Sequence, residues 1–171
     1  KVTTEGLGLL PTARPIILAA NHSSYLDGAV LAYALGVPLR FVAKAELSKT
    51  PITRIFLNRL GSHFVERFDV GKTLADAGAI QQLVRGGRPV VYFPEGTLSR
   101  MAGLLPFQTG AFQAAIENQA TIGPVVIRGS RHVLRDGAFI PCPGRIIVRL
   151  LTPLLSEPAT DPYPSATWRR A

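Results

Sequence analysis

The chain has 171 residues, of which 47% are apolar and 18% are charged, so it is long and apolar enough to bury a core and is not a disordered protein. Its formal net charge of +8 favours anionic partners, but no basic face interleaved with aromatic residues is present, so nucleic acid is not expected among them. One cysteine, Cys142, excludes an internal disulfide framework and a multi-cysteine metal site.

Strands and helices are predicted to alternate along the chain. The first strand, residues 14–20, is a continuous apolar run with β-branched residues, and the helix predicted over residues 24–35 ends at a Gly-Val-Pro turn. The other predicted elements are, in order, strand 39–44, helix 49–61, strand 62–67, helix 71–87, strand 88–93, helix 107–118, strand 121–129 and strand 145–151. This alternation predicts an α/β fold with a central sheet flanked by helices on both faces, in a single domain over residues 1–171. Because the chain opens with Lys1, we expect it to be a fragment or one domain of a longer protein.

The end of the first strand carries the pattern with the most chemical content. Asn21 and His22 close the apolar run, and Asp27 follows five residues after the histidine. Residues five apart in a regular helix point about 140° away from each other, so the two side chains meet only if His22 stands in the turn before the helix. With Ser23 or Ser24 as the helix N-cap, Asp27 would fall in the first helical turn. Its carboxylate would there accept the Nδ1–H of His22 and leave Nε2 free as a base.

The same two residues allow a plainer interpretation. His22 would then only close the strand, and Asp27 would only complement the positive end of a helix. The pair taken alone favours this plainer interpretation, because short spacings recur by accident. Two such residues without a third ligand nearby do not predict a metal site.

Two further patches lie where predicted strands end, the region in which function collects in α/β sheets. The first, G-S-H-F-V-E-R, ends in Arg67, which is either a phosphate-binding side chain or a solvated arginine. The second is F-P-E-G-T, residues 93–97, in which Gly96 lets a ligand approach the backbone. The Glu95 carboxylate can accept a hydrogen bond from a hydroxyl or orient Arg67. Each patch alone is also compatible with an ordinary strand end or turn.

The order and spacing of these patches resemble the four sequence blocks of the glycerolipid acyltransferases, the family with the H-x-x-x-x-D motif. F-P-E-G-T matches the third block in full, and the resemblance covers residues 15–151. The matching residues of the other blocks are Asn21, His22 and Asp27 in the first, Gly61, Phe64, Val65 and Arg67 in the second and, loosely, Pro124 and Val125 in the fourth. Together the blocks favour the catalytic interpretation of His22.

The resemblance implies a mostly parallel sheet like that of glycerol-3-phosphate acyltransferases. It implies transfer of a fatty acyl group from acyl-CoA or acyl-carrier protein, as co-substrate, to the free hydroxyl of a lysophospholipid, with 1-acylglycerol-3-phosphate as the expected acceptor. No cofactor and no metal are implied. His22 and Asp27 are the implied catalytic residues, and backbone N–H groups near Gly96 or Thr97 are the expected oxyanion donors. The implied substrate-binding residues are Arg67, Glu95, Gly96, Thr97 and Arg100.

One position departs from the family pattern: Leu98 stands where many members carry arginine, and Arg100 follows two residues later. Residues 52–60 interleave arginines with apolar residues, which suits a lipid surface, although core packing is the preferred explanation. We expect a protein at the cytoplasmic face of a membrane, bound peripherally or through a segment outside this chain. The alternatives are a non-catalytic lipid-binding or acyl-carrier-binding module of a larger protein, and acylation of a different lyso-lipid.

Overall fold

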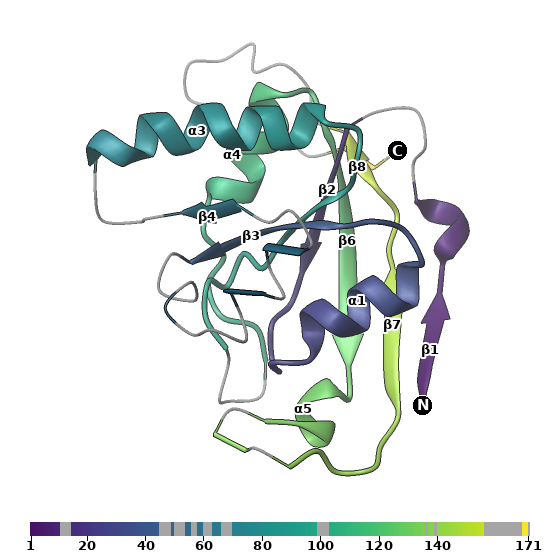
Figure 1. Ribbon diagram of the computed structural model, residues 1–171. Helices are drawn as coiled ribbons and strands as arrows, with labels where there is room; N and C mark the ends of the chain where they lie inside the picture. Colours follow the sequence, from purple (N-terminus) through teal and green to yellow (C-terminus); the bar gives the residue numbers. More distant parts are fainter. Residues whose placement is uncertain are drawn as a thin grey trace.

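The computed structural model describes residues 1–10, 15–44, 49, 54–55, 58–59, 63–65, 70–98, 103–135, 137–138, 140–155 and 169–170, and within them nine strands form one sheet (Figure 1). The strands are β1 (Val2–Glu5), β2 (Ile16–Ala20), β3 (Arg40–Lys44), β4 (His63–Val65), β5 (Val90–Tyr92), β6 (Thr121–Arg128), β7 (Ile146–Leu150), β8 (Leu154–Leu155) and β9 (Arg169–Arg170). The helices are the 3-10 turn η1 (Leu7–Leu9), α1 (Asp27–Leu35), α3 (Val70–Arg85), α4 (Gly110–Glu117) and α5 (Ser130–Val133).

The sheet is mostly parallel, as predicted. The neighbouring strands β6, β2, β5, β3 and β4 all run in the same direction. On the other side of β6 the chain reverses, because β7 pairs with it antiparallel, and β1 then pairs parallel with β7 at the edge. The short strands β8 and β9 add antiparallel pairs beside β6. The predicted α/β fold with a mostly parallel sheet is confirmed.

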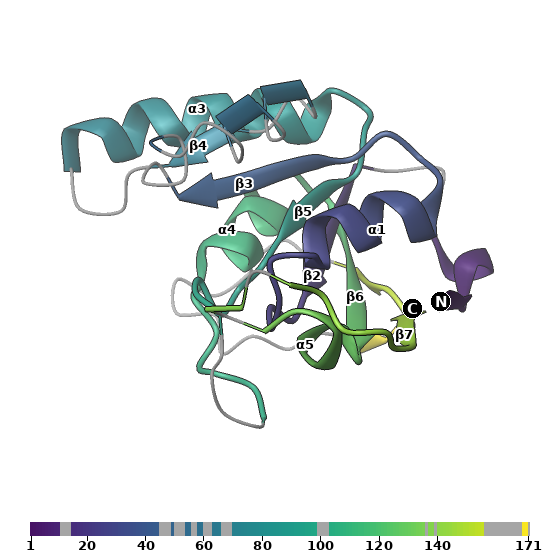
Figure 2. The ribbon, with the colours of Figure 1, turned by 60° about the horizontal axis from the view of Figure 1, so that its bottom comes forward.

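The strand β2 shows why its sequence is apolar without alternation. Ile16 and Leu18 face the core that α1 covers, whereas Ile17 faces a second core on the opposite side of the sheet, beneath α4. A strand that is covered on both faces has no position for a polar side chain. Figure 2 shows α1 and α4 on the two sides of β2. The prediction of helices on both faces is therefore confirmed.

Most predicted elements are present with shifted ends, and three short strands, β1, β8 and β9, were not predicted. The strand β1 begins with one valine and two threonines, a β-branched signal, but it is only four residues long and half exposed, so hydrophobic periodicity does not reveal it. The helix predicted over residues 24–35 begins at Asp27, and no side chain caps it. Of the helix predicted over residues 49–61, only residues 49, 54–55 and 58–59 lie within the described residues.

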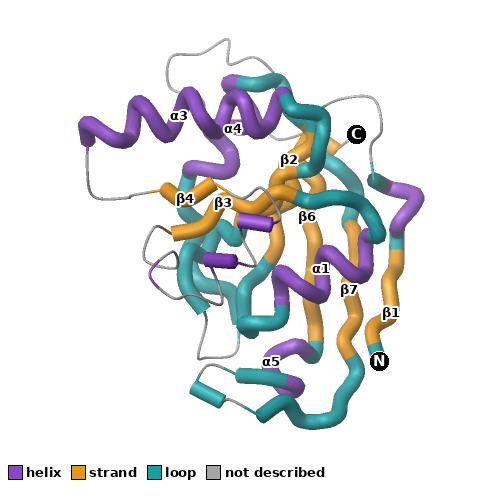
Figure 3. Tube along the Cα trace, viewed as in Figure 1, coloured by secondary structure: helices purple, strands orange, loops and turns teal. Residues whose placement is uncertain are grey.

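The parallel strands place their carboxyl ends at one edge of the sheet. At this edge β2 leads into the loop before α1, β5 leads into the turn that begins at Phe93, and β6 leads into α5. Figure 3 shows the loops at the ends of β2 and β6 lying next to α5. We call this the carboxyl edge below, and its three loops carry the residues that the sequence singles out.

Candidate active site

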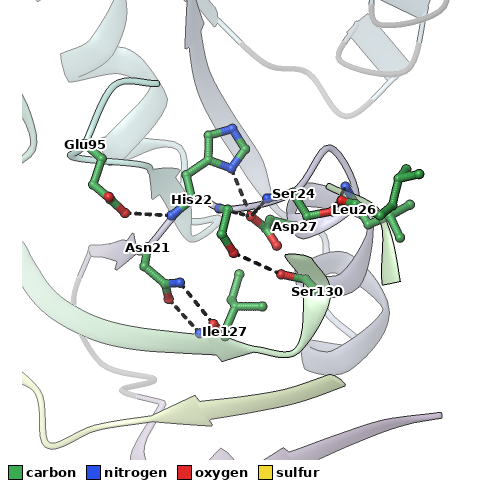
Figure 4. Close-up of polar contacts among 10 residues, drawn as sticks. Asn21, His22, Ser24, Leu26, Asp27, Glu95, Ile127 and Ser130 are labelled. Atoms are coloured by element: carbon green, nitrogen blue, oxygen red, sulfur yellow. Dashed lines mark hydrogen bonds and ion pairs between the residues drawn. The ribbon is translucent and has the colours of Figure 1, made fainter. Parts of the chain in front are cut away.

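His22 and Asp27 are in direct contact in the loop between β2 and α1. The Nδ1 atom of His22 lies 3.0 Å from Oδ2 of Asp27, and the Asp27 side chain is fully buried, whereas that of His22 is 22% exposed (Figure 4). The predicted geometry, with histidine in the turn and aspartate in the first helical turn, is therefore present. Figure 4 shows the second ring nitrogen of His22 pointing away from Asp27. An Nδ1–H that donates to the carboxylate leaves Nε2 with a free lone pair.

The Asp27 carboxylate is held by the backbone of its own loop. The N–H groups of Ser23 and Ser24 donate to the same Oδ2 atom, at 2.7 and 2.8 Å. The predicted serine N-cap would have had a side chain of the loop accept an N–H of the helix. In the structure the roles are reversed, because the side chain of the helical residue Asp27 accepts N–H groups of the loop. The two N–H groups stabilise a buried carboxylate that would otherwise be costly, and they fix its position independently of His22.

Asn21 continues the pairing of β2 and β6 through its side chain. The backbone register of the two strands ends at Ala20 opposite Val125. Beyond it, the Asn21 amide donates to the carbonyl of Ile127 at 3.0 Å and accepts from the N–H of Ile127 at 2.7 Å (Figure 4). Because only a side chain with one donor and one acceptor makes both bonds, an asparagine directly before His22 fixes where the loop leaves the sheet.

Helix α5 and the residue that follows it contact the loop between β2 and α1 through polar groups. The fully buried Ser24 donates from Oγ to the carbonyl of Leu134 at 2.5 Å and accepts the N–H of Leu26 at 3.1 Å. The hydroxyls of Ser23 and Ser130 lie 3.3 Å apart, and Ser130 is also fully buried. These polar contacts join a loop near residue 24 to a turn more than a hundred residues later, so the His22 loop depends on the segment after β6.

The turn F-P-E-G-T lies against the histidine. The Phe93 ring stacks on the imidazole of His22, with ring centroids 4.1 Å apart and an interplanar angle of 19°. Pro94 precedes Glu95 in a turn closed by the Gly96 N–H donating to the Phe93 carbonyl at 2.9 Å, and Gly96 has a φ of 69°, which favours glycine. The Gly96 N–H therefore already has an acceptor, and the expected oxyanion donors near Gly96 or Thr97 stay a prediction.

Glu95 contacts the backbone on both sides of the turn. Its Oε1 atom accepts the N–H of His22 at 2.9 Å (Figure 4). Its Oε2 atom accepts the N–H of Leu105 at 2.8 Å. Thr97 is exposed two residues later. The carboxyl edge thus brings together His22, Asp27, Glu95, Gly96 and Thr97 from the predicted site.

The two predicted phosphate-binding arginines, Arg67 and Arg100, lie outside the described residues, so their roles stay predictions. Within the described part of the chain, no group of three or more His, Cys, Asp or Glu side chains is placed to hold a metal ion. In the same part of the chain, none of the helices is both long and apolar enough to cross a membrane.

Three residues of the site were not singled out for their roles: Asn21, Phe93 and Ser130. Asn21 and Phe93 lie within the matching blocks, so their place in the sequence marked them, but not what they contact. Ser130 follows β6 and lies outside all four blocks. Its contact with Ser23 depends on how the chain folds back, which no local pattern encodes.

Comparisons with known proteins agree with this arrangement. Residues 1–128 match the sequence pattern of the family described as Acyltransferase, and the matched range ends at the last residue of β6. A chloroplastic 1-acyl-sn-glycerol-3-phosphate acyltransferase of Brassica napus is 29% identical over 139 residues, or 81% of this chain and 40% of the relative. A lyso-ornithine lipid O-acyltransferase of Brucella abortus is 33% identical over 168 residues, or 91% of this chain and 62% of the relative.

A solved structure shares the fold. The crystal structure of the 1-acyl-sn-glycerophosphate (LPA) acyltransferase PlsC from Thermotoga maritima aligns with a TM-score of 0.75 at 26% identity, covering 90% of this chain and 61% of that protein. This chain spans between 40% and 62% of the length of these three relatives. The family match covers all four blocks, and the structure places His22 and Asp27 of the first block in contact. The chain therefore belongs to the Acyltransferase family.

Proposed function

We propose that this protein transfers a fatty acyl group from an acyl thioester to the free hydroxyl of a lysophospholipid, with 1-acylglycerol-3-phosphate as the acceptor. The contact between His22 Nδ1 and the buried Asp27 carboxylate carries the proposal, because it orients a histidine with its second nitrogen free. The names of the relatives from Brassica and Thermotoga, both acyltransferases acting on that acceptor, support the choice of substrate.

In the proposed reaction, Nε2 of His22 removes the proton of the acceptor hydroxyl while its oxygen attacks the thioester carbonyl carbon. A carbon–oxygen bond forms, the carbon–sulfur bond breaks, and the imidazolium returns the proton to the departing thiolate. Asp27 keeps the ring in the required tautomer and stabilises the imidazolium. No serine or cysteine nucleophile is required, because the acceptor hydroxyl itself attacks.

The proposed reaction also needs a donor that stabilises the oxyanion and side chains that bind the acceptor phosphate. With the Gly96 N–H engaged in its turn, the N–H of the exposed Thr97, the next residue, is the remaining backbone candidate for the oxyanion. Arg67 and Arg100 are proposed to bind the acceptor phosphate, because an arginine pairs with phosphate through two parallel hydrogen bonds. No cofactor takes part in the proposed reaction; acyl-CoA or acyl-carrier protein is the co-substrate.

A different acceptor is the second candidate. The relative from Brucella, named for a lyso-ornithine lipid, is 33% identical over 168 residues, a longer and more similar match than that with the Brassica relative. A lyso-ornithine lipid has a free hydroxyl but no phosphate, so Arg67 would then lose its proposed ligand. The base and its carboxylate would act in the same way on either acceptor.

A panel of acceptors and donors tests the proposal and separates these candidates. The purified full-length protein is supplied with acyl-CoA or acyl-carrier-protein thioester and with either lysophosphatidate or a lyso-ornithine lipid, and ester formation is measured. Esterification of lysophosphatidate supports the first candidate, and esterification of the lyso-ornithine lipid alone supports the second. A protein that binds these lipids without acylating them would instead be the non-catalytic module.

We also propose that the protein works at the cytoplasmic surface of a membrane. The loops of the carboxyl edge support this location, since the side chains of Tyr25, Leu104, Phe107 and Ile140 are each at least 49% exposed there. Apolar side chains of this kind enter a lipid interface, and the net charge of +8 favours anionic lipids. Replacing Leu104 and Phe107 with serine should reduce co-sedimentation with anionic vesicles, whereas replacing the exposed Tyr33 of α1 should not; equal binding of all three proteins would contradict the proposal.

A further inference from the structure

Glu95 has contacts that suit a role different from the binding of substrate. The side chain is only 5% exposed, and each carboxylate oxygen has a backbone donor. Neither donor is charged and neither belongs to a side chain, so the carboxylate serves the fold of two loops. One of these loops begins with the proposed base, His22.

The position of His22 explains why a carboxylate is needed there. The backbone pairing of β2 with β5 ends at Ala19 opposite Tyr92, so the N–H of His22 lies past the last pair of that ladder. A partly buried N–H without an acceptor is destabilising. The turn after β5 brings Glu95 to this N–H, and Asn21 holds the neighbouring peptide to β6. The loop is thus fixed from both neighbouring strands immediately before the imidazole.

Contact between the Glu95 carboxylate and the phosphate of the acceptor would be unfavourable. A carboxylate and a phosphate are both anionic and repel each other, most strongly where water is excluded. A hydroxyl of the acceptor would need to reach a side chain that is almost fully buried. Both arguments favour a role for Glu95 that does not involve contact with the lipid.

We propose that Glu95 is a positioning residue that acts on His22 and not on the acceptor. It holds the backbone of His22 so that the ring meets both Asp27 and Phe93, and its second hydrogen bond ties that backbone to the loop of residues 103–109. This inference rests on the proposed function of His22 as the base. It assigns the glutamate of F-P-E-G-T to the geometry of the base instead of to recognition of the lipid.

Steady-state kinetics of the full-length protein carrying Glu95→Gln test the assignment. Glutamine keeps the length and one oxygen acceptor, but its NH₂ group faces a backbone N–H, so one of the two hydrogen bonds is lost. We expect kcat to fall about 10²-fold, the usual consequence of a small misplacement of a catalytic group, while KM for the acceptor is unchanged. A raised KM with an unchanged kcat would overturn the assignment. The matched control is Glu5→Gln, the same chemical change at an exposed carboxylate on the edge strand β1, which should leave both constants unchanged.

A binding measurement keeps this test separate from that of the proposed function. Calorimetric titration of lysophosphatidate into His22→Ala and into His22→Ala/Glu95→Gln measures acceptor affinity without turnover. Equal dissociation constants support the positioning role, whereas weaker binding to the double variant shows that Glu95 contacts the acceptor. Absence of binding to the unmodified protein would instead count against the choice of acceptor.

A measurement on the unmodified protein covers the case in which Glu95→Gln does not fold. The backbone amide of His22 should be protected from hydrogen exchange, because Glu95 accepts its N–H within a partly buried loop. The backbone amide of Gly137, an exposed loop residue, provides the reference for rapid exchange. Exchange of the His22 amide as fast as that reference would contradict the contact on which the assignment depends.

Discussion

A single oxygen atom, Oδ2 of Asp27, accepts hydrogen bonds from His22, Ser23 and Ser24. Asp27→Asn keeps the size of the side chain but removes its charge, so the imidazolium that forms during proton transfer loses its stabilising partner. We expect kcat to fall by about 10³- to 10⁴-fold, with little change in the KM for the acceptor. Acyl transfer from a labelled thioester measures the effect.

The control for Asp27→Asn is Glu117→Gln, which neutralises an exposed carboxylate at the end of α4. It should leave kcat unchanged. If Asp27→Asn retained most of the turnover of the unmodified protein, Asp27 would be part of the loop fold only, which is the plainer interpretation of the sequence.

Individual residues were predictable to different degrees. The spacing of His22 and Asp27 has few geometric solutions, and so the contact between them was predicted correctly from the sequence. The partners of Glu95 were not, because a sequence does not reveal which backbone N–H groups remain unpaired at the end of a strand. The contact of Asn21 with Ile127 was not predicted either, because it depends on the register of β2 against β6.

At the scale of elements, the junction between β6 and α5 depends on a glycine. Gly129 has a φ of 86°, and a Cβ atom at this position would lie 2.1 Å from the carbonyl oxygen of Arg145. Gly129→Ala should therefore lower the free energy of unfolding through backbone strain and a steric clash, and it should displace α5 from the His22 loop. We expect a loss of more than about 2 kcal/mol in urea denaturation, accompanied by a lower kcat.

Gly137→Ala is the matched control for the clash. Gly137 also has a positive φ, of 79°, but a Cβ atom there would meet nothing within 4 Å. This variant should lose only the strain contribution, about 1 kcal/mol, and keep its kcat. Equal losses of stability in the two variants would contradict the steric contribution at Gly129.

The elements with strong periodicity were predicted, and those fixed by long-range contacts were not. The buried run of β2 and the stripe of α3 have the patterns of their classes, and both are present within a few residues of the expected ends. The strand β1 and the helix α5 contain four residues each, too few for a pattern. They form because β7 and the His22 loop provide their hydrogen-bonding partners.

At the scale of the whole molecule, the ionisation of a buried tyrosine links stability to pH. Burial, and to a lesser extent the nearby Glu117 carboxylate, raise the pKa of Tyr92 well above its usual range. Its hydroxyl has no hydrogen-bond partner among the described residues. The unfolded chain releases the Tyr92 proton above about pH 10, while the folded protein retains it, so this group lowers the free energy of unfolding as pH rises above that value.

Tyr92→Phe should remove that pH dependence. At pH 7 the variant should be as stable as the unmodified protein or more so, because it buries no unpaired hydroxyl. Between pH 10 and 11 the unmodified protein should lose up to about 1.4 kcal/mol relative to the variant. Urea denaturation at pH 7 and between pH 10 and 11 measures the difference in stability, and Tyr33→Phe, at an exposed tyrosine, is the control. An equal pH dependence of the unmodified protein and Tyr92→Phe would contradict this account of the core.

The central claim is that His22 is the base that activates the acceptor hydroxyl, and acyl transfer by His22→Ala tests it most directly. The matched control is His132→Ala, at an exposed histidine on α5. With folding verified by circular dichroism, we predict that His22→Ala lowers kcat by about 10²- to 10⁴-fold and that His132→Ala leaves it unchanged. Turnover by His22→Ala at the rate of the unmodified protein would contradict the claim.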